Sequence, residues 1–313
     1  MTSHSPIQRI AHPLFEQYQL TVDIKRDDLL HPVISGNKWR KLKYNIKHLQ
    51  QHNYQGIVSF GGGYSNHIHA LAYAGHYYGF ATVGVIRGEA HYANNYSLQC
   101  AQKWGMELKF IDRKSYRQKT EASFLEQLQQ QYRNYFIVPE GGSNQLALPG
   151  VAEVCQELNQ QTNYDTLITP VGSAGTLAGL ITGDNNQHQL LGIAVLKQGE
   201  YLVDDVKQLI PNTGTDNNWQ ILTQYHCGGY AKFSQQDLAE LKAFSHITGV
   251  PFEPIYSGKM ILALLDLIKN NTFAPGHHIV LLHTGGLQGL AGLAEQNKLK
   301  ADEWPLPPGL QVL

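Results

Sequence analysis

The chain has 313 residues, of which only 16% are charged, and its formal net charge is −1. The length suits two lobes or one large α/β domain, and a hydrophobic content of 42% excludes a mostly disordered chain. A near-neutral composition argues against nucleic acids and anionic membranes as partners, because both require a basic patch. The sequence starts without an apolar signal core and has no apolar run near the ~20 residues that span a bilayer, so we expect a cytoplasmic protein. Three separated cysteines without a CxxC pair predict neither a disulfide framework nor a zinc site, and no metal is expected.

Apolar, β-branched runs alternate with amphipathic segments along most of the chain. The runs predict strands at 56–60, 81–86, 107–111, 135–138, 166–170, 190–195 and 278–282. The amphipathic segments predict helices at 37–51, 66–78, 94–104, 122–132, 151–158, 176–182, 202–209, 236–248, 259–268 and 288–295. Strands that are apolar on both faces and separated by helices indicate parallel sheets covered on both sides. The pattern therefore predicts an α/β fold.

Four of the predicted strands are followed by a glycine cluster with small polar residues. The clusters are SFGGGYSNH (59–67), VPEGGSN (138–144), TPVGSAGT (169–176) and LLHTGGLQG (281–289). A glycine after a strand often makes only a tight turn, but glycines before a helix also let an anion approach unpaired N–H groups. Loops of this kind gather at the carboxyl ends of parallel strands. None of the four fits GxGxxG or GxxxxGK[ST], so the common dinucleotide and P-loop sites lack their fingerprint.

The predicted helix 37–51 begins with an unusual lysine. In SGNKWRKLKYNIKHL (35–49), Ser35 or Asn37 can cap the helix, and Lys38 then lies in the first turn, where the helix dipole disfavours a cation. Lys38 could be one solvated lysine among several. It could also be an amine of lowered pKa, suited to Schiff-base chemistry, with Lys41 at i+3 binding a phosphate. Together with the glycine loops, this second interpretation describes a pyridoxal phosphate site.

Seven motifs occur in the order found in one protein family. They are GNKWRKLKY (36–44), SNH (65–67), EGGSN (140–144), GSAGTLAGL (172–180), GGY (228–230), YSGK (256–259) and HTGG (283–286). The sequence resembles the 1-aminocyclopropane-1-carboxylate deaminase and D-cysteine desulfhydrase family over nearly its whole length, and the lysine motif is the most specific part. The resemblance implies a two-lobed type II pyridoxal phosphate fold, like that of tryptophan synthase β, with mostly parallel twisted sheets and helices on both faces.

The resemblance also implies a role for each matched residue. Lys38 would form the Schiff base with the cofactor and later move the substrate proton. Ser65 would take the substrate carboxylate, and Tyr256 and Tyr230 would approach the substrate and the cofactor face. The other cofactor-binding residues would be Lys41, Gly172, Ser173, Ala174, Gly175 and Thr176 at the phosphate, Asn66 at the ring hydroxyl oxygen, and Thr284 at the ring nitrogen. His67 and His283 would be polar neighbours of the site.

Two positions bear on the reaction. The ring-opening deaminases of this family typically carry Glu where this chain has Ser257 and Leu where it has Thr284, whereas desulfhydrase-like members have small hydroxyl residues there. A carboxylate near the pyridine nitrogen would favour its protonation and deepen the electron sink that ring opening needs. Expulsion of a thiolate needs a weaker electron sink, because the leaving group accepts the electrons itself. We therefore expect αβ-elimination from a small D-amino acid, first of all D-cysteine, giving pyruvate, hydrogen sulfide and ammonia.

Other functions stay open at this point. The first alternative is 1-aminocyclopropane-1-carboxylate deaminase, and the second is a non-catalytic protein that binds pyridoxal phosphate or an amino acid. Tyr64 stands where many family members have Gln beside the carboxylate pocket, so D-serine, chloro-D-alanine or an L-amino acid could also be the substrate. Ala231 replaces a glycine that commonly follows GGY, which would shift the ring of Tyr230.

By resemblance, a smaller domain is inserted into a larger one. The inserted domain would run from 42 to 148. The larger, cofactor-binding domain would comprise 1–41 and 149–313, with the cofactor in the cleft between the lobes. Family members are generally dimers or larger, so a homodimer with a small amino-acid substrate is expected.

Overall fold

The computed structural model describes residues 4–210 and 218–300. The chain divides into two compact units. Unit 1 comprises Met1–Asn37 and Leu148–Leu287, and unit 2 comprises Lys38–Ala147 and Gln288–Leu313.

Unit 1 is built on a six-stranded sheet with the strand order β1-β2-β10-β7-β8-β9. Its strands are β1 (Ile7–Ile10), β2 (Thr21–Lys25), β7 (Thr166–Val171), β8 (Gln189–Ala194), β9 (Trp219–Leu222) and β10 (His278–Leu282). β1 pairs antiparallel with β2, and the other neighbours are parallel. The loops that follow β7, β8 and β10 therefore lie at the same edge of the sheet.

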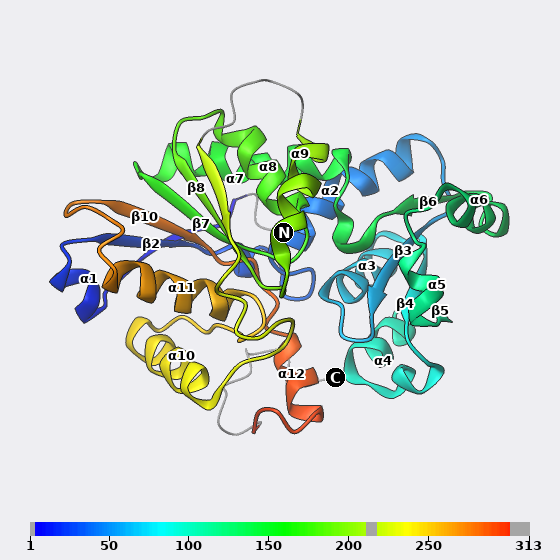
Figure 1. The fold of residues 1–313 in the computed structure, drawn as a ribbon. Helices are drawn as coiled ribbons and strands as arrows, with labels where there is room; N and C mark the ends of the chain where they lie inside the picture. Colours follow the sequence, from blue (N-terminus) through cyan, green and yellow to red (C-terminus); the bar gives the residue numbers. More distant parts are fainter. Residues whose placement is uncertain (1–3, 211–217, 301–313) are drawn as a thin grey trace. The chain divides into compact units, whose positions relative to one another are not determined.

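Helices cover both faces of this sheet (Figure 1). They are α1 (Pro13–Gln17), α7 (Leu148–Gln161), α8 (Gly175–Asp184), α9 (Leu202–Leu209), α10 (Gln235–Thr248) and α11 (Ser257–Lys269). The apolar sides of α7, α8 and α9 form one core cluster with alternate strand residues such as Leu167, Val171 and Val280. α11 contacts β7 and β8 and lies on the other face, beside α10 (Figure 1). Strands buried on both faces explain the continuous apolar runs of the sequence.

Unit 2 contains a four-stranded parallel sheet with the order β5-β4-β3-β6. The strands are β3 (Gly56–Gly62), β4 (Ala81–Arg87), β5 (Glu107–Ile111) and β6 (Tyr135–Val138). The helices are α2 (Asn37–Gln51), whose first residue belongs to unit 1, α3 (Asn66–Tyr78), α4 (Tyr96–Lys103), α5 (Arg113–Arg117), α6 (Ala122–Gln131) and α12 (Gly289–Glu295). Tyr116, Leu128 and Tyr132 from α5 and the α6 segment pack on Val58 and Val83 of the sheet.

Short 3₁₀ turns connect several of these elements. They are η1 (Asp27–Leu29), η2 (Ala90–Asn94), η3 (Glu140–Gly142), η4 (Gln145–Ala147) and η5 (Gly199–Tyr201). The turn η3 contacts both β3 and α3, so the EGGSN motif lies against the start of α3 inside unit 2.

Helix α12 belongs to unit 2, whereas the resemblance implies that 288–313 are part of the larger domain. The carboxylate of Glu295 accepts a hydrogen bond of 2.8 Å from the N–H of Tyr96, at the start of α4. Gly292 lies against the ring of Tyr64, where a larger residue would collide. These contacts attach the helix to unit 2. The predicted boundary near 41 also differs, since the units divide after Asn37.

All the predicted strands and helices are present, with ends that shift by a few residues, and the predicted parallel α/β architecture is confirmed. Among the described residues, five short strands and α-helices were not predicted: β1, β2, β9, α1 and α5. β2 was missed because Asp23 and Lys25 interrupt its apolar pattern although both are buried. Lys25 Nζ lies 2.6 Å from a carboxylate oxygen of Glu157 in α7, and Asp23 pairs with Arg9 and His278. Because these partners are distant in sequence, the residues around β2 give no sign that its charged side chains are buried.

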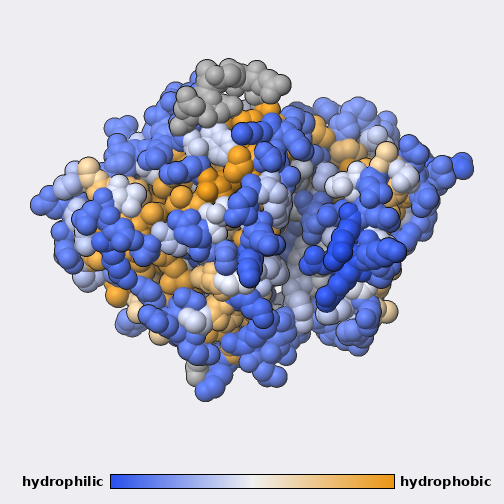
Figure 2. All heavy atoms as spheres, viewed as in Figure 1, coloured by the Kyte–Doolittle hydropathy of each residue, from blue (hydrophilic) through white to orange (hydrophobic). Residues whose placement is uncertain are grey.

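Within the described ranges, no helix is both long enough and apolar enough to cross a membrane. Figure 2 shows hydrophilic residues over most of the viewed face, with hydrophobic ones among them over unit 1. Scattered apolar residues of this kind are usual for a protein surface.

Candidate active site

Asn37, at the start of α2, joins two of the predicted glycine loops of unit 1. Its N–H donates to the carbonyl oxygen of Thr284 (3.2 Å), and its side-chain amide donates to Oγ1 of Thr176 (2.8 Å). Gly36 before it has a positive φ of 65°, and a Cβ there would stand 1.9 Å from the Thr284 carbonyl oxygen. Only glycine permits that approach. The residue before Lys38 is thereby fixed to the loops that follow β7 and β10.

The loop after β7 has the features of a phosphate site. Gly172, Ser173 and Ala174 lead into α8, which begins at Gly175 and has Thr176 in its first turn. Ala174 is the N-cap residue and has no side-chain acceptor to cap the helix. A helix start with small residues and the hydroxyls of Ser173 and Thr176 turns backbone N–H groups and a positive dipole end toward an anion. These residues fit the phosphate of pyridoxal phosphate, as the resemblance implies.

Tyr256 and Tyr230 lie together beside this loop. Their rings are 5.9 Å apart between centroids, and the hydroxyl of Tyr256 donates to the hydroxyl of Tyr230 (3.3 Å). A Cβ on Gly172 would stand 2.7 Å from Cε1 of Tyr256, so the ring of Tyr256 occupies the space over the glycine. Unit 1 therefore brings together Tyr230, Tyr256 and the loop that starts at Gly172.

Thr284 and Ser257, the two positions that bear on the reaction, flank the same loop of unit 1. Thr284 is connected to Thr176 through Asn37, and Ser257 follows Tyr256, which contacts Gly172. Ser257 is fully buried, and its hydroxyl donates to the carboxylate of Glu253 (3.0 Å). His283 supports the loop after β10: Nδ1 accepts from the N–H of Gly285, and Nε2 binds the Pro251 carbonyl oxygen.

Lys38 and Lys41 lie on one face of α2 in unit 2. Lys38 is partly exposed, whereas Lys41 is fully buried. Lys41 Nζ donates to the carbonyl oxygen of Gly141 (3.2 Å) and to Oγ of Ser143 (3.0 Å), both neutral groups of the EGGSN motif. Burial, and then the charge of Lys38, hold the pKa of Lys41 well below its usual range. A buried amine in such surroundings is suited to an anionic ligand such as a phosphate.

Ser65, Asn66 and His67 form the start of α3 in unit 2. Ser65 is the N-cap residue, and its hydroxyl accepts the N–H of Ile68 (3.3 Å). Ser59 Oγ donates to the carbonyl oxygen of Val138, so Nε2 of His67 donates to Ser59 (2.8 Å). This leaves Nδ1 of His67 as a buried acceptor with no hydrogen-bond partner in the structure, next to Gly142. Burial, and then Lys38 and Lys41, hold the pKa of His67 well below its usual range, so the ring is neutral.

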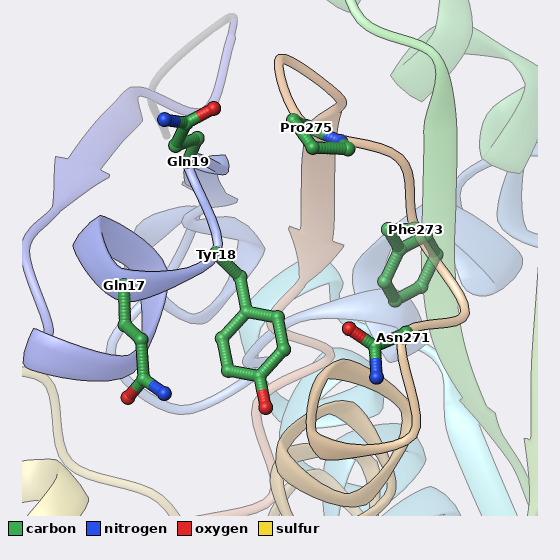
Figure 3. A pocket seen from close by; sticks show the side chains of 6 residues that line it. All are labelled: Gln17, Tyr18, Gln19, Asn271, Phe273 and Pro275. Carbon is green, nitrogen blue, oxygen red and sulfur yellow. The ribbon is translucent and has the colours of Figure 1, made fainter.

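A pocket of unit 1 lies at the other edge of its sheet (Figure 3). Its lining comes from the segments that precede β2 and β10: Gln17, Tyr18, Gln19, Asn271, Phe273 and Pro275. The glycine loops follow the strands, so this pocket is separate from the candidate site. Among the described residues, no three His, Cys, Asp or Glu side chains gather as a metal-binding group.

Sequence reasoning missed Glu253 and Lys259. Both are fully buried charged residues that flank Tyr256. Glu253 precedes the predicted helix 259–268, and Lys259 is its first residue. Charged residues at such positions are usually exposed to solvent, so the sequence did not indicate that these two are buried. The only available sign was their place on either side of the tyrosine in the YSGK motif.

Comparison with known proteins shows which enzymes this chain resembles. The family model described as "Pyridoxal-phosphate dependent enzyme" matches residues 5–285. A putative 1-aminocyclopropane-1-carboxylate deaminase of Thermotoga maritima is 30% identical, over 91% of this chain and 95% of the relative. The bifunctional mitochondrial D-cysteine desulfhydrase/1-aminocyclopropane-1-carboxylate deaminase of Arabidopsis thaliana is 28% identical, over 90% of this chain and 76% of the relative. A solved structure of an ACC deaminase homologue superposes with a TM-score of 0.81 at 25% identity, covering 94% of this chain and 93% of that chain.

Proposed function

The chain belongs to the family of pyridoxal-phosphate dependent enzymes, and from this premise we propose that it catalyses αβ-elimination from a small D-amino acid, with D-cysteine as the first candidate. It is an enzyme whose relatives are 1-aminocyclopropane-1-carboxylate deaminase and D-cysteine desulfhydrase homologues, and its fold is the type II fold of that family. Bound pyridoxal phosphate supplies an electron sink for a carbanion at the substrate α-carbon. The finer proposal concerns which substrate is used.

The proposed roles are those that the family resemblance implies for the matched residues. Lys38 takes the α-proton of the substrate, and Ser65 with the start of α3 binds the substrate carboxylate. The two tyrosine hydroxyls orient the reacting amino acid. Hydrosulfide leaves from the β-carbon, and the enamine product takes up water to give pyruvate and ammonia. The cofactor-binding residues are Lys41, Asn66, Gly172, Ser173, Ala174, Gly175, Thr176 and Thr284.

One observation carries the choice of elimination over ring opening: the chain has hydroxyl side chains, not Glu and Leu, at positions 257 and 284. Ser257 is buried and its hydroxyl is bound to the carboxylate of Glu253. A second carboxylate at that position would be buried beside Glu253, and like charges at such a distance disfavour each other. The local structure thus favours a hydroxyl at position 257, which suits a substrate with its own good leaving group.

The second candidate is 1-aminocyclopropane-1-carboxylate deaminase. It is favoured by the Thermotoga maritima relative, which bears that name, and by the Arabidopsis thaliana relative, whose name includes both activities. Ring opening of 1-aminocyclopropane-1-carboxylate gives 2-oxobutanoate and ammonia, so the two reactions differ in a measurable product.

The test is a substrate panel with the protein loaded with pyridoxal phosphate. We expect pyruvate, sulfide and ammonia from D-cysteine, and little product from L-cysteine. Lys38→Ala should abolish turnover and the visible absorbance of the bound cofactor, whereas Lys47→Ala, an exposed lysine on the same helix, should change neither. Formation of 2-oxobutanoate from 1-aminocyclopropane-1-carboxylate, without sulfide from D-cysteine, would replace the first candidate with the second.

A further inference from the structure

Glu253 is a fully buried carboxylate whose two oxygens are both used as acceptors. It accepts the N–H groups of Ile255 (2.6 Å), Tyr256 (3.0 Å) and Ser257 (2.7 Å), and the hydroxyl of Ser257 (3.0 Å). These donors belong to the first turn of α11 and the residues just before it. The N-cap residue, Tyr256, provides no side-chain cap, so the carboxylate of Glu253 satisfies the helix start in its place.

The segment from Glu253 to Gly258 is closed on itself by further bonds. The N–H of Glu253 donates to Oγ of Ser257 (3.1 Å), and the N–H of Gly258 donates to the carbonyl oxygen of Glu253 (2.7 Å). Tyr256 lies in the middle of this closed segment. Its backbone N–H reaches both carboxylate oxygens of Glu253 at 3.0 Å. The direction in which the tyrosine ring leaves the chain is therefore fixed by Glu253.

Lys259, in the first turn of α11, holds the backbone beside the second tyrosine. Its buried Nζ donates to the carbonyl oxygens of Val195 (3.0 Å) and Gly229 (2.7 Å). Val195 follows β8, and Gly229 is the residue before Tyr230. The start of α11 thus holds the backbone beside both tyrosines, whose hydroxyls are 3.3 Å apart.

We propose that Glu253 is a positioning residue for the reaction, acting through Tyr256: its buried carboxylate keeps the ring against Gly172 and the hydroxyl on Tyr230. This inference rests on the proposed function, because it assigns Tyr256 a part in handling the substrate. Glu253 touches neither substrate nor cofactor. A small rotation of the tyrosine would remove its hydroxyl from Tyr230 and its ring from Gly172, and misplacement by about 1 Å can cost about 100-fold in rate.

The variants that test this inference are Glu253→Gln, Glu253→Asp, Tyr256→Phe and the double variant Glu253→Gln/Tyr256→Phe. Gln keeps one acceptor but turns an NH₂ group toward N–H donors, whereas Asp keeps both oxygens and should recover part of the activity. Asp184→Asn is the matched control. Asp184 is also a buried carboxylate that accepts backbone N–H groups, those of Gln187 and His188, but it lies at the end of α8 away from the glycine loop.

We expect Glu253→Gln to lower kcat by roughly 10- to 100-fold with a smaller change in KM, and Asp184→Asn to lower the thermal midpoint without changing kcat. In the Tyr256→Phe background, Glu253→Gln should lower kcat by less than about 3-fold, because the hydroxyl that it positions is already gone. The same fold loss of kcat in both backgrounds would overturn the inference. If Glu253→Gln does not fold, Glu253→Asp in the two backgrounds provides the same comparison.

A second readout needs no turnover. The circular dichroism of protein-bound pyridoxal phosphate reports the surroundings of the cofactor, and Glu253→Gln and Tyr256→Phe should change it alike while Asp184→Asn does not. If the wild type is inactive on every amino acid of the panel but the dichroism changes as expected, the proposed function fails and the positioning role stands. If the wild type is active and the dichroism of Glu253→Gln equals that of the wild type, the positioning role fails and the function stands.

Discussion

Gly292 of α12 lies directly under the ring of Tyr64, so close that a Cβ on Gly292 would stand 2.4 Å from Cδ1 of the tyrosine. By resemblance, Tyr64 borders the substrate carboxylate pocket, beside Ser65. Burial, and then Glu295 of α12, raise the pKa of Tyr64. Tyr64 stands where many family members have Gln, and its larger ring is accommodated by Gly292, in a helix far along the sequence. Within unit 2, the C-terminal helix and the carboxylate loop form one packed structure.

Gly292→Ala should raise KM for the amino-acid substrate several-fold while leaving kcat nearly unchanged. In an open helix this substitution would stabilise by about 1 kcal/mol, but here the added methyl displaces the tyrosine ring. Tyr64→Gln in the same chain should restore KM, because the smaller side chain leaves room. Ala294→Val, at a partly exposed position of α12, is the control and should leave KM unchanged. A KM for Gly292→Ala equal to that of the wild type would contradict the coupling.

Lys41→Met should weaken binding of pyridoxal phosphate by about 100-fold, because a hydrogen bond from a charged donor contributes about 2–3 kcal/mol. The same variant should bind pyridoxal, which lacks the phosphate, as the wild type does. Equilibrium titration of the visible absorbance measures both affinities, and Lys47→Met is the exposed control. Equal weakening for the two ligands would show that Lys41 supports the fold and does not bind the phosphate.

Most of the fold could be predicted from the sequence because its main signals are local. Helix α2 begins and ends at the predicted residues, since a glycine of positive φ at 36 fixes its start and an amphipathic pattern continues to Gln51. β2 could not be predicted. Its buried Lys25 pairs with Glu157, 132 residues away, and the sequence of the strand does not indicate that partner.

The candidate site, like the fold, could be predicted from the sequence only in part. The motifs predict residues that would meet a ligand, such as Lys38, because a cation is unusual in the first turn of a helix. They do not identify the residues that hold these in place. Asn37 bonds to Thr176 and Thr284, far along the chain, and such contacts exist only once the chain is folded. Glu253 bonds to N–H groups of its own segment, where a lone Glu is not distinctive in the sequence. The homodimer and the cytoplasmic location stay predictions.

His69→Phe should stabilise the protein by about 1–2 kcal/mol near pH 7, because a buried imidazole without partners loses its hydrogen bonds to water. His69 is 2% exposed, neither ring nitrogen has a hydrogen-bond partner, and the ring meets Trp104 edge-on at 4.8 Å. The phenyl ring keeps the contact with the indole. Urea denaturation measures the gain, and His76→Phe, an exposed position of the same helix, should show none.

The gain from His69→Phe should also grow as the pH falls. Burial lowers the pKa of His69 from 6.5 to about 4, so between these values the unfolded chain binds a proton that the folded chain does not. Wild-type stability therefore falls as the pH drops from 6.5 toward 4. The variant has no imidazole at position 69, so its stability lacks this contribution to the pH dependence. Identical pH slopes for the two proteins would show that His69 is protonated in the folded state.

Ser257→Glu alone should destabilise the protein by about 3–5 kcal/mol and should not create ring-opening activity, because it buries a second carboxylate beside Glu253. Burial already raises the pKa of Glu253 to about 7, although the N–H groups of Ser257, Tyr256 and Ile255 oppose the rise. Ser257→Gln, which has the same size without the charge, should be less harmful, and adding Glu253→Gln to Ser257→Glu should recover part of the stability. Urea denaturation at pH 8 measures these differences, since both carboxylates are then driven to ionise. If Ser257→Glu with Thr284→Leu is stable and converts 1-aminocyclopropane-1-carboxylate to 2-oxobutanoate, position 257 accepts a carboxylate, and the argument for elimination from the Glu253–Ser257 pair is lost.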